Sequence, residues 1–320
     1  MKKYSTDWYW YYTINSVLVI LILFPIYWTF ISSVKKPHEL ITSEPTFYPH
    51  TWTWQYYKNI WNSGITADGW IDQREDMDWG NEQVKDSKVE VNKAQSQGDK
   101  SYRNRSIQRA FFNSVIVSAG TIILTIIVTT LAGYALTIFR IPFKEVIFIL
   151  LILPILVPGI SLIIPLYKLL KELGLTDSYL GLILLHTTGM LPIGVFMMRN
   201  AFTSIPGSLR EVALLEGTSE LKIILTVMLP LAIPGLLTVM VFAMYQSWND
   251  YVYAFLFTNT PEMQMLNVAL AKIAMGGSQF EIKWGSLTAG SMISFIPIII
   301  FYILLQRYFV RGITGSAVKE

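Results

Sequence analysis

Few residues in this chain have the types and spacing that chemistry requires. The 320 residues include no cysteine and three histidines, which excludes a thiolate metal site and a cysteine nucleophile. His38 and His50 lie in a polar segment, and His186 lies in an apolar one. The sequence has no G-x-x-x-x-G-K-[ST] phosphate loop, H-E-x-x-H or G-x-S-x-G motif. We therefore predict no catalytic residue, no bound metal and no cofactor in the chain itself.

Composition indicates an integral membrane protein. The chain is 52% hydrophobic and 15% charged, with a mean hydropathy of +0.44, whereas soluble domains carry about 25% charged residues. The charges avoid the long apolar stretches and gather in one polar segment. The net charge of +3 is too small and too scattered for a nucleic-acid surface. A soluble enzyme, a disordered protein and a nucleic-acid binder are therefore excluded.

Six apolar stretches reach the length of about 20 residues that a helix needs to cross a bilayer. None contains Asp, Glu, Lys or Arg, and none alternates as barrel strands do. Because lipid offers the backbone no hydrogen-bond partner, these spans must be helical. We predict an all-α fold with six transmembrane helices at Ile14–Ser33, Phe112–Leu136, Val146–Tyr167, Tyr179–Met198, Ile223–Tyr245 and Ser286–Leu305. The first is expected to be a retained anchor, since its apolar run is too long for a cleaved signal peptide.

The Lys and Arg residues of short loops predict the orientation, because cytoplasmic loops carry more of them. With the N-terminus inside, ten fall on the cytoplasmic side and four on the other. The long loop is left out, since loops beyond about 60 residues escape this rule. We expect residues 1–33 to form a cytoplasmic segment and the first helix, and residues 34–110 to form an external loop. This loop has a polar insertion at about 62–109, which includes a candidate helix around 82–97. Residues 111–310 are expected to form a five-helix core, and residues 311–320 a cytoplasmic tail. Both termini are thus predicted to be cytoplasmic.

The predicted spans also bear on the source of energy. Ion-coupled transporters usually carry a carboxylate or a basic residue at membrane depth, and these spans have no Asp, Glu, Lys or Arg. Energy would then come from a partner that acts on a cytoplasmic surface, and the alternative is passive conduction.

The pattern LP-x3-PG occurs at Leu153–Gly159 in the third span and at Leu229–Gly235 in the fifth. Each copy predicts a kink, because proline removes a helical donor and clashes with the preceding turn.

The segment at about 204–222, between the fourth and fifth spans, carries signals for a short helix. Pro206 and Gly207 break the chain, and Ser208 can then cap a helix with Glu211 completing a capping box. Gly217 supplies the left-handed position that ends a helix after about two turns. We predict a short helix on the cytoplasmic side, fixed at both ends.

The apolar residues of this helix predict a contact. Leu209, Val212 and Ala213, flanked by Leu215, give one mostly apolar face. Helices of this length are marginal in water, so the face should pack against something. Two readings stay open on these grounds: packing against its own bundle or the headgroups, and insertion into a groove of a cytoplasmic protein.

The segment resembles the EAA loop of ATP-binding-cassette (ABC) importer permeases, E-A-A-x3-G-x9-I-x-L-P. The positions that match at the correct spacing are Glu211, Ala213, Gly217, Leu229 and Pro230. Val212 replaces the second-position Ala, and Val227 replaces the Ile. The chain also resembles the carbohydrate-importer branch, specifically the maltose-type second permease subunit, at 163–167 (IIPLY), 173–184 (LGLTDSYLGLIL), 204–206 (SIP), 248–250 (WND) and 306–312 (QRYFVRG). The resemblance covers 30–61 and 111–318, and the insertion at 62–109 departs from it.

This resemblance implies a type I ABC importer permease fold and a set of partners. The chain would pair with a homologous second permease, two cytoplasmic ATPase subunits would bind ATP and Mg, and an extracytoplasmic binding protein would deliver a sugar or oligosaccharide. It implies the bacterial cytoplasmic membrane as the location. The residues implied to couple to the ATPase are Glu211, Val212, Ala213, Leu215, Glu216 and Gly217. A tail with Arg311, Gly312 and Thr314, expected to be extended, would also reach the ATPase interface.

Polar residues at membrane depth are candidates for the translocation path, because such groups must contact protein or a water-filled cavity. The candidates are Asn113, His186, Tyr245, Gln246, Trp248 and Asn249. Hydrogen bonding between helices is the alternative for each of them. An autonomous passive channel is the alternative function, and it predicts solute flux from this chain alone. A membrane enzyme would need a polar catalytic cluster, of which the sequence gives no sign.

Overall fold

The computed structural model describes residues 7–40, 42, 44–62, 107–275 and 284–317. None of these residues forms a β-strand, so the all-α prediction is confirmed for them. The candidate helix around 82–97 lies outside the described residues, as does most of the predicted insertion. The chain divides into two compact units, one combining Met1–Gln108 with Ala269–Ile296 and the other combining Arg109–Val268 with Pro297–Glu320. We call them unit 1 and unit 2.

Unit 1 contains the first long helix and the segment that follows it. Its elements are α1 (Asp7–Val34), α2 (Pro37–Leu40), α3 (Gln55–Asn62), most of α14 (Leu266–Met275) and the first part of α15 (Trp284–Ala317). The end of α1 is tied to α3 by a hydrogen bond of 2.7 Å between the Ser33 and Tyr57 hydroxyls. Gly285 of α15 faces the ring of Tyr56, and a side chain at this glycine would overlap that ring.

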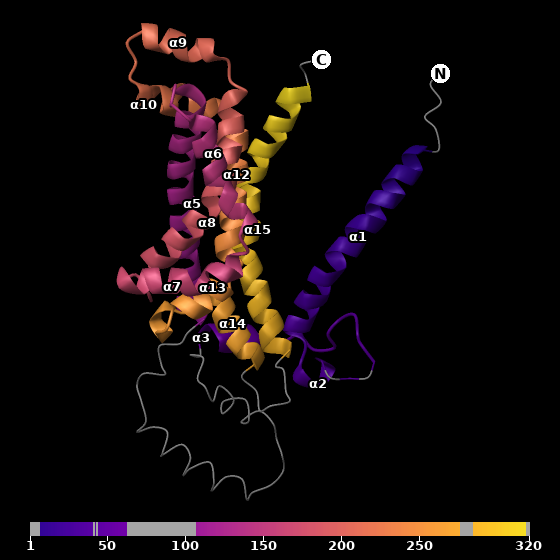
Figure 1. The fold of residues 1–320 in the computed structure, drawn as a ribbon. Coiled ribbons are helices and arrows are strands. Elements are labelled where there is room, and N and C mark those ends of the chain that lie inside the picture. The colour runs from indigo at the N-terminus through magenta and orange to yellow at the C-terminus, as the bar shows by residue number, and fades with distance from the viewer. Residues whose placement is uncertain (1–6, 41, 43, 63–106, 276–283, 318–320) are drawn as a thin grey trace, which may run out of the picture. The chain divides into compact units, whose positions relative to one another are not determined.

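Unit 2 is a helical bundle that contains the remaining elements (Figure 1). In chain order they are α5 (Ile107–Ile138), α6 (Lys144–Ile152), η2 (Leu153–Leu156), η3 (Gly159–Leu162), α7 (Ile163–Glu172), α8 (Tyr179–Thr203), α9 (Gly207–Leu215), α10 (Glu220–Ile223), the π-helical turn η4 (Ile224–Met228), α11 (Leu229–Leu231), α12 (Ile233–Trp248), α13 (Val252–Phe257) and η5 (Pro261–Met263). The last part of α15 also belongs to this unit.

Four helices are long and apolar enough to cross a membrane, at Trp10–Val34, Ile107–Ile138, Tyr179–Thr203 and Trp284–Tyr308. They contain four of the six predicted spans. The other two fall on helix pairs that bend by 98° between Leu156 and Gly159 and by 85° between Leu231 and Ile233. Both bends coincide with the LP-x3-PG patterns, which confirms the predicted kinks. The described helices therefore give four spans, or up to six if each bent pair is one span.

Two buried clusters hold unit 2 together. One joins α5, α8, α9 and the helices from α10 to α12, through Tyr134, Met198, Phe202, Ala213, Ile223, Ile224, Met228, Ala232 and Val239. The other joins α5, α7, α8, α13 and α14 through Val117, Leu170, Leu182, Ala254, Phe257, Met265 and Val268.

Glycines let α5 and α8 approach closely. A Cβ at Gly133 of α5 would lie 2.7 Å from Cβ of Met198 and 3.0 Å from the backbone N of Arg199. A Cβ at Gly194 of α8 would lie 2.5 Å from Cγ2 of Thr129. Small residues permit such close approach, which is a main source of helix association in membranes.

Candidate functional site

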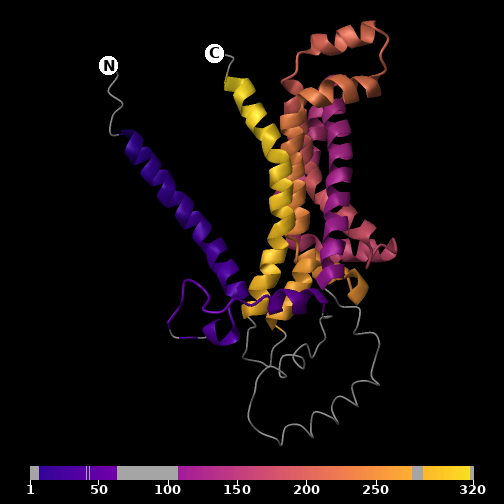
Figure 2. The same cartoon turned by 180° about the vertical axis from the view of Figure 1, so that it is seen from behind.

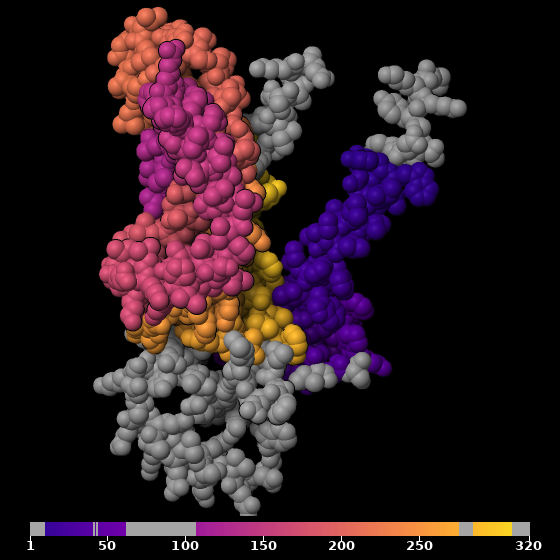
Figure 3. Space-filling model, viewed as in Figure 1, coloured from indigo at the N-terminus to yellow at the C-terminus, as the bar shows by residue number. Residues whose placement is uncertain are grey.

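The short helix α9 lies at one end of unit 2, between α8 and α10 (Figures 1 and 2). The predicted helix is therefore present, over Gly207–Leu215. The C-terminal part of α15 runs toward the same end of the unit in both views. In the space-filling view, α9 and the turns beside it form this end of the unit (Figure 3).

The start of α9 differs from the prediction. Pro206 occupies the N-cap position with φ −58°, and no side chain caps the helix. Proline holds its φ near the helical value without needing a donor, so the helix begins directly at Gly207. Ser208 is then the second helical residue, and the predicted capping box between Ser208 and Glu211 is wrong.

The end of α9 agrees with the prediction. Gly217 has φ +76°, the left-handed conformation that glycine adopts without steric cost. Its N–H donates to the carbonyl of Leu214 at 2.9 Å, and the N–H of Thr218 donates to the carbonyl of Ala213 at 3.1 Å. These two bonds form a Schellman motif, which satisfies carbonyls that the helix end leaves free.

An ion pair that the sequence analysis missed attaches α9 to the bundle. The guanidinium of Arg210 contacts the carboxylate of Glu220 at the start of α10. The Tyr134 hydroxyl of α5 donates to Glu220 Oε2 at 2.6 Å and accepts from Arg210 Nε at 3.2 Å. The hydrogen bond to Glu220 raises the pKa of Arg210 above its usual value. In the sequence, the opposite charges of Arg210 and Glu220 on either side of Gly217 were the signal that could have predicted this ion pair.

The single apolar face predicted for α9 is divided in the structure. Ala213 is buried against the bundle, whereas Val212 is 55% exposed and Leu215 is 89% exposed. Glu211 and Glu216 are exposed as well. Unit 2 therefore holds the helix through Arg210 and Ala213 and leaves Val212 and Leu215 uncovered.

Exchanging the charges of Arg210 and Glu220 tests this attachment. We expect Arg210→Glu and Glu220→Arg each to lower the thermal stability of the purified chain, because each places like charges together beside Tyr134. The double exchange should restore part of the loss, with a coupling energy of about 1 kcal/mol for a partly exposed pair. Thermal unfolding of the three variants measures it. Strictly additive effects would show that the two side chains do not interact.

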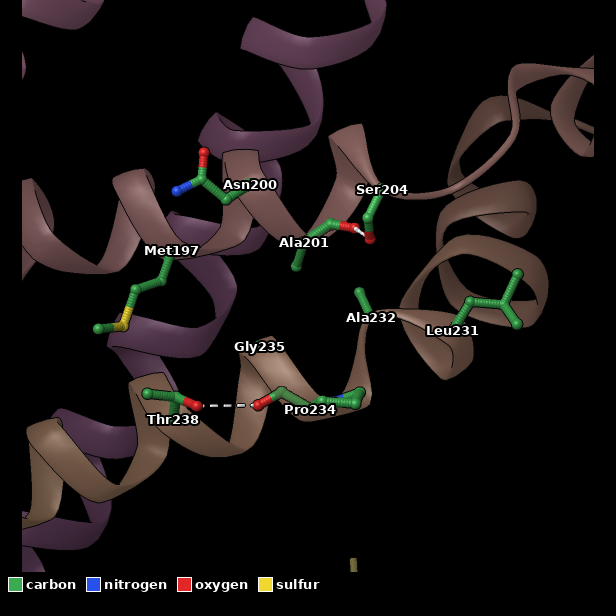
Figure 4. Close-up of a pocket in the computed structure, with 9 residues that line it drawn as sticks. All are labelled: Met197, Asn200, Ala201, Ser204, Leu231, Ala232, Pro234, Gly235 and Thr238. Carbon is green, nitrogen blue, oxygen red and sulfur yellow. Dashed lines mark hydrogen bonds between the residues drawn. The ribbon is translucent and has the colours of Figure 1, made fainter. Parts of the chain in front are cut away.

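A cavity of about 280 Å³ lies beside the bend between α11 and α12 (Figure 4). It is lined by Met197, Asn200, Ala201 and Ser204 of the α8 end and by Leu231, Ala232, Pro234, Gly235 and Thr238. The Ser204 and Thr238 hydroxyls donate to the carbonyls of Ala201 and Pro234, at 2.8 and 3.0 Å. The helices meet at its edge, where a Cβ at Gly235 would lie 2.6 Å from Cβ of Ala201.

Among the described residues, the hydrogen-bond partners of Asn113 of α5 all belong to unit 2. Its Nδ2 donates to the carbonyls of Glu262 and Gln264 at 2.8 and 2.9 Å. Its Oδ1 accepts from the Tyr179 hydroxyl at 2.7 Å. These contacts favour the alternative of hydrogen bonding between elements over a role in the path.

The path candidates on α12 lie on different sides of that helix. Tyr245 is 68% exposed and Asn249 is exposed. Gln246 lies over Gly189 of α8, where a Cβ would come within 2.7 Å of its Nε2. Trp248 is buried, and its ring meets that of Phe111 edge to face at 6.0 Å. The structure thus places Tyr245 and Asn249 on the surface of unit 2, Gln246 half-buried against α8, and Trp248 inside the unit.

His186 of α8 is buried and faces Asp250, with 3.6 Å between Nε2 and Oδ2. Asp250 is a functional candidate that the sequence analysis did not select. The pair joins α8 to the corner between α12 and α13, so the helix-joining alternative for His186 is the one that the contacts favour.

The predicted extended tail is wrong. The helix α15 continues to Ala317 and includes Arg311, Gly312 and Thr314. Each glycine costs a helix only about 1 kcal/mol, and adding a residue to an established helix is easy compared with starting one. The two glycines at 312 and 315 therefore do not end a helix of this length.

These features describe a helical bundle with helices long and apolar enough to cross a membrane and with a short helix displayed at one end. The family described as "Binding-protein-dependent transport system inner membrane component" matches residues 122–315. The match covers more than half of the 320 residues, and the chain belongs to this family.

Named relatives agree with this membership. The inner membrane ABC transporter permease protein YcjP of Escherichia coli (strain K12) is 28% identical over 95% of this chain and 94% of its own length. The trehalose transport system permease protein SugB of Mycobacterium tuberculosis is 33% identical over 68% of this chain and 79% of its own. A solved bacterial ABC transporter involved in alginate import aligns with a TM-score of 0.70 and 21% identity, over 97% of this chain and 100% of that one. This likeness confirms the predicted ABC importer permease fold.

Proposed function

We propose that this chain is the sugar-translocating permease subunit of an importer whose ATPase subunits dock on α9. The observation that carries the proposal is the exposed outer side of α9, with Val212 and Leu215 uncovered on a helix whose ends are fixed. Relatives named for trehalose and for arabinooligosaccharide transport support a sugar or oligosaccharide as the solute.

Coupling would require α9 to move with its ATPase and to pull the bundle with it. The ion pair between Arg210 and Glu220, with Tyr134 beside it, attaches α9 to both α10 and α5. The turn at Gly217 fixes the angle between α9 and α10. ATP and Mg would be bound by the ATPase subunits, and this chain would contribute Glu211, Glu216 and the apolar pair Val212 and Leu215 to the contact.

Site-directed crosslinking tests this docking, because the chain has no native cysteine. A cysteine at Leu215 that carries a photo-crosslinker should capture an ATP-hydrolysing subunit in the assembled complex. Leu173, which follows α7 and is also exposed, provides the matched control and should not capture it. The docking proposal fails if Leu215 captures no ATPase, or if both positions give the same products.

The proposed orientation puts both termini and α9 in the cytoplasm and the segment 62–109 outside. It rests on the excess of Lys and Arg in the loops assigned to the cytoplasm. We expect protease added to the outside of spheroplasts to cleave the chain within 62–109. A periplasmic protein and a cytoplasmic protein serve as controls for leakage. Cleavage only by protease on the cytoplasmic side would reverse the orientation.

A second permease subunit and an external binding protein complete the proposal. The exposed Tyr245 and Asn249 of α12 would line the solute path, since one carries an aromatic ring and the other an amide, as sugar recognition requires. A passive channel is the alternative. Sugar flux into liposomes that contain only this chain, without ATP or ATPase subunits, would favour the channel.

A further inference from the structure

A buried pair of ionisable residues lies in unit 2, and the coupling proposal does not use it. His186 is 2% exposed, and the side chain of Asp250 is 10% exposed. Their 3.6 Å contact is an ion pair when the imidazole is protonated. The Nδ1 atom of His186 is buried without a hydrogen-bond partner among the described residues. Because an apolar pair is often at least as stable as a buried ion pair, and ionisable groups at membrane depth are usually functional, a role beyond stability is indicated.

Asp250 organises the corner between α12 and α13, which we define as residues 248–251. Its Oδ1 accepts from the N–H of Tyr253 at 3.2 Å, and its Oδ2 accepts from the N–H of Ala254 at 2.8 Å. The carboxylate thereby caps α13. The Asn267 amide donates to the carbonyls of Trp248 and Asp250, at 2.8 and 3.2 Å. The corner is thus tied to α13 and α14, and through His186 it is tied to α8.

Of the two exposed candidates of the transport path, Asn249 lies in this corner and Tyr245 lies one turn before it on α12. Asn249 Nδ2 donates to the carbonyl of Tyr245 at 3.0 Å, so the two residues share one face of the α12 end. Gln246, the residue after Tyr245, lies over Gly189, which follows His186 by about one turn of α8. A movement of the corner relative to α8 would therefore change the direction of Tyr245 and Asn249.

The described titratable groups that face the imidazole are few. Asp250 faces it from the corner, and the ring of Tyr253 on α13 meets it nearly perpendicular, with 6.2 Å between ring centroids. The Tyr253 hydroxyl donates to the carbonyl of Gly159 at 3.4 Å. Protonation puts a hydrogen on both imidazole nitrogens, so that each can donate a hydrogen bond, and it adds an electrostatic attraction to Asp250. Loss of that proton would weaken the tie between α8 and the corner.

We propose that His186 is a positioning residue of the transport path, which acts through Asp250 on the corner that contains Asn249 and follows Tyr245 at the end of α12. The inference rests on the proposed function, because that function makes these two residues part of the solute path. It adds that the direction of these side chains depends on the protonation of one buried imidazole.

Cysteine reactivity tests the positioning role in the reconstituted complex. Tyr245→Cys is labelled with a membrane-impermeant, positively charged methanethiosulfonate reagent, and Leu173→Cys, at an exposed position outside the proposed contacts, is labelled in parallel. The ratio of the two rates removes the pH dependence that every thiol shows. We expect this ratio to change several-fold when titration to acidic pH changes the charge of the imidazole.

Variants of His186 separate positioning from stability. His186→Leu should abolish the pH dependence of the ratio and shift its value several-fold. His186→Gln should also abolish the pH dependence, but it should keep the ratio near the value that the wild type reaches at one end of the pH range. Thr187 is the neighbouring buried residue, and its hydroxyl also has no hydrogen-bond partner among the described residues. Thr187→Val should leave the labelling ratio and its pH dependence unchanged.

The inference is overturned if the His186→Leu variant keeps the wild-type ratio at every pH, or if Tyr245→Cys is not labelled at all. Crosslinking of Leu215 to the ATPase does not involve His186. If that crosslink forms while the labelling ratio ignores His186, the importer function stands and the positioning role alone is lost.

Discussion

Replacing Gly217 with valine should abolish ATP-driven uptake while the chain still accumulates in the membrane. Gly217 adopts φ +76°, and for an L-residue this conformation costs about 1–2 kcal/mol, more for a β-branched one. No atom lies within 4 Å of a Cβ placed there, so the strain is confined to the turn and does not disturb the bundle. The α9 helix would lose its Schellman bonds and its fixed angle. Uptake by the reconstituted complex, normalised to the amount of chain, measures the effect.

Two substitutions serve as controls for this result. Gly207 begins α9, has no positive φ, and also has open space around its Cα. Gly207→Ala should therefore transport as the wild type does. Gly217→Asn should keep part of the activity, because asparagine tolerates the left-handed conformation better than other residues. Uptake at the wild-type rate by the valine variant would remove Gly217 from the coupling mechanism.

Replacing Gly133 with leucine should prevent stable folding of unit 2. Its Cβ alone would lie 2.7 Å from Cβ of Met198 and 3.0 Å from the backbone of Arg199. A backbone cannot rotate away as the end of a flexible side chain can, so α5 and α8 would have to separate. Overpacking of this kind costs about 1–3 kcal/mol or more. We expect a lower melting temperature in detergent and a smaller amount of chain in the membrane.

The matched control places the same side chain at an open position. Gly207→Leu adds leucine where no atom lies within 4 Å of the new Cβ, so it should leave the melting temperature unchanged. If Gly133→Leu melts at the wild-type temperature, the close approach of α5 and α8 is not needed for stability.

Local sequence signals predicted the helices and their ends where backbone chemistry decides the outcome. The bends at Leu153–Gly159 and Leu229–Gly235 follow from proline, and the end of α9 follows from the φ of Gly217. Ser208 shows the limit, because Pro206 could begin the helix without a side-chain cap. The prediction of an extended tail was wrong for a related reason, because a long helix tolerates glycines that would stop a short one.

Contacts between distant residues could not be predicted in this way. Asp250 was visible as the last residue of a WND pattern, but nothing in the sequence said that it meets His186 on another helix. The contact of Tyr134 with Arg210 and Glu220 likewise depends on how α5 packs against the turn at Gly217. Predicting either contact requires knowing how the helices cross, and this depends on packing at Gly133, Gly194 and Gly235.

The π-helical turn Ile224–Met228 has a consequence for insertions and deletions. Such a turn holds one residue more than an α-helical turn. Deleting one residue there would let the helix close this turn with ordinary α-helical bonds and would leave the flanking residues on nearly the same faces. Deleting a residue from the α-helical part of α12 would instead rotate Glu220 by about 100° around the helix axis, away from Tyr134, and α9 would lose its attachment. The turn at Ile224–Met228 can therefore absorb the loss of one residue that the regular helix beside it could not.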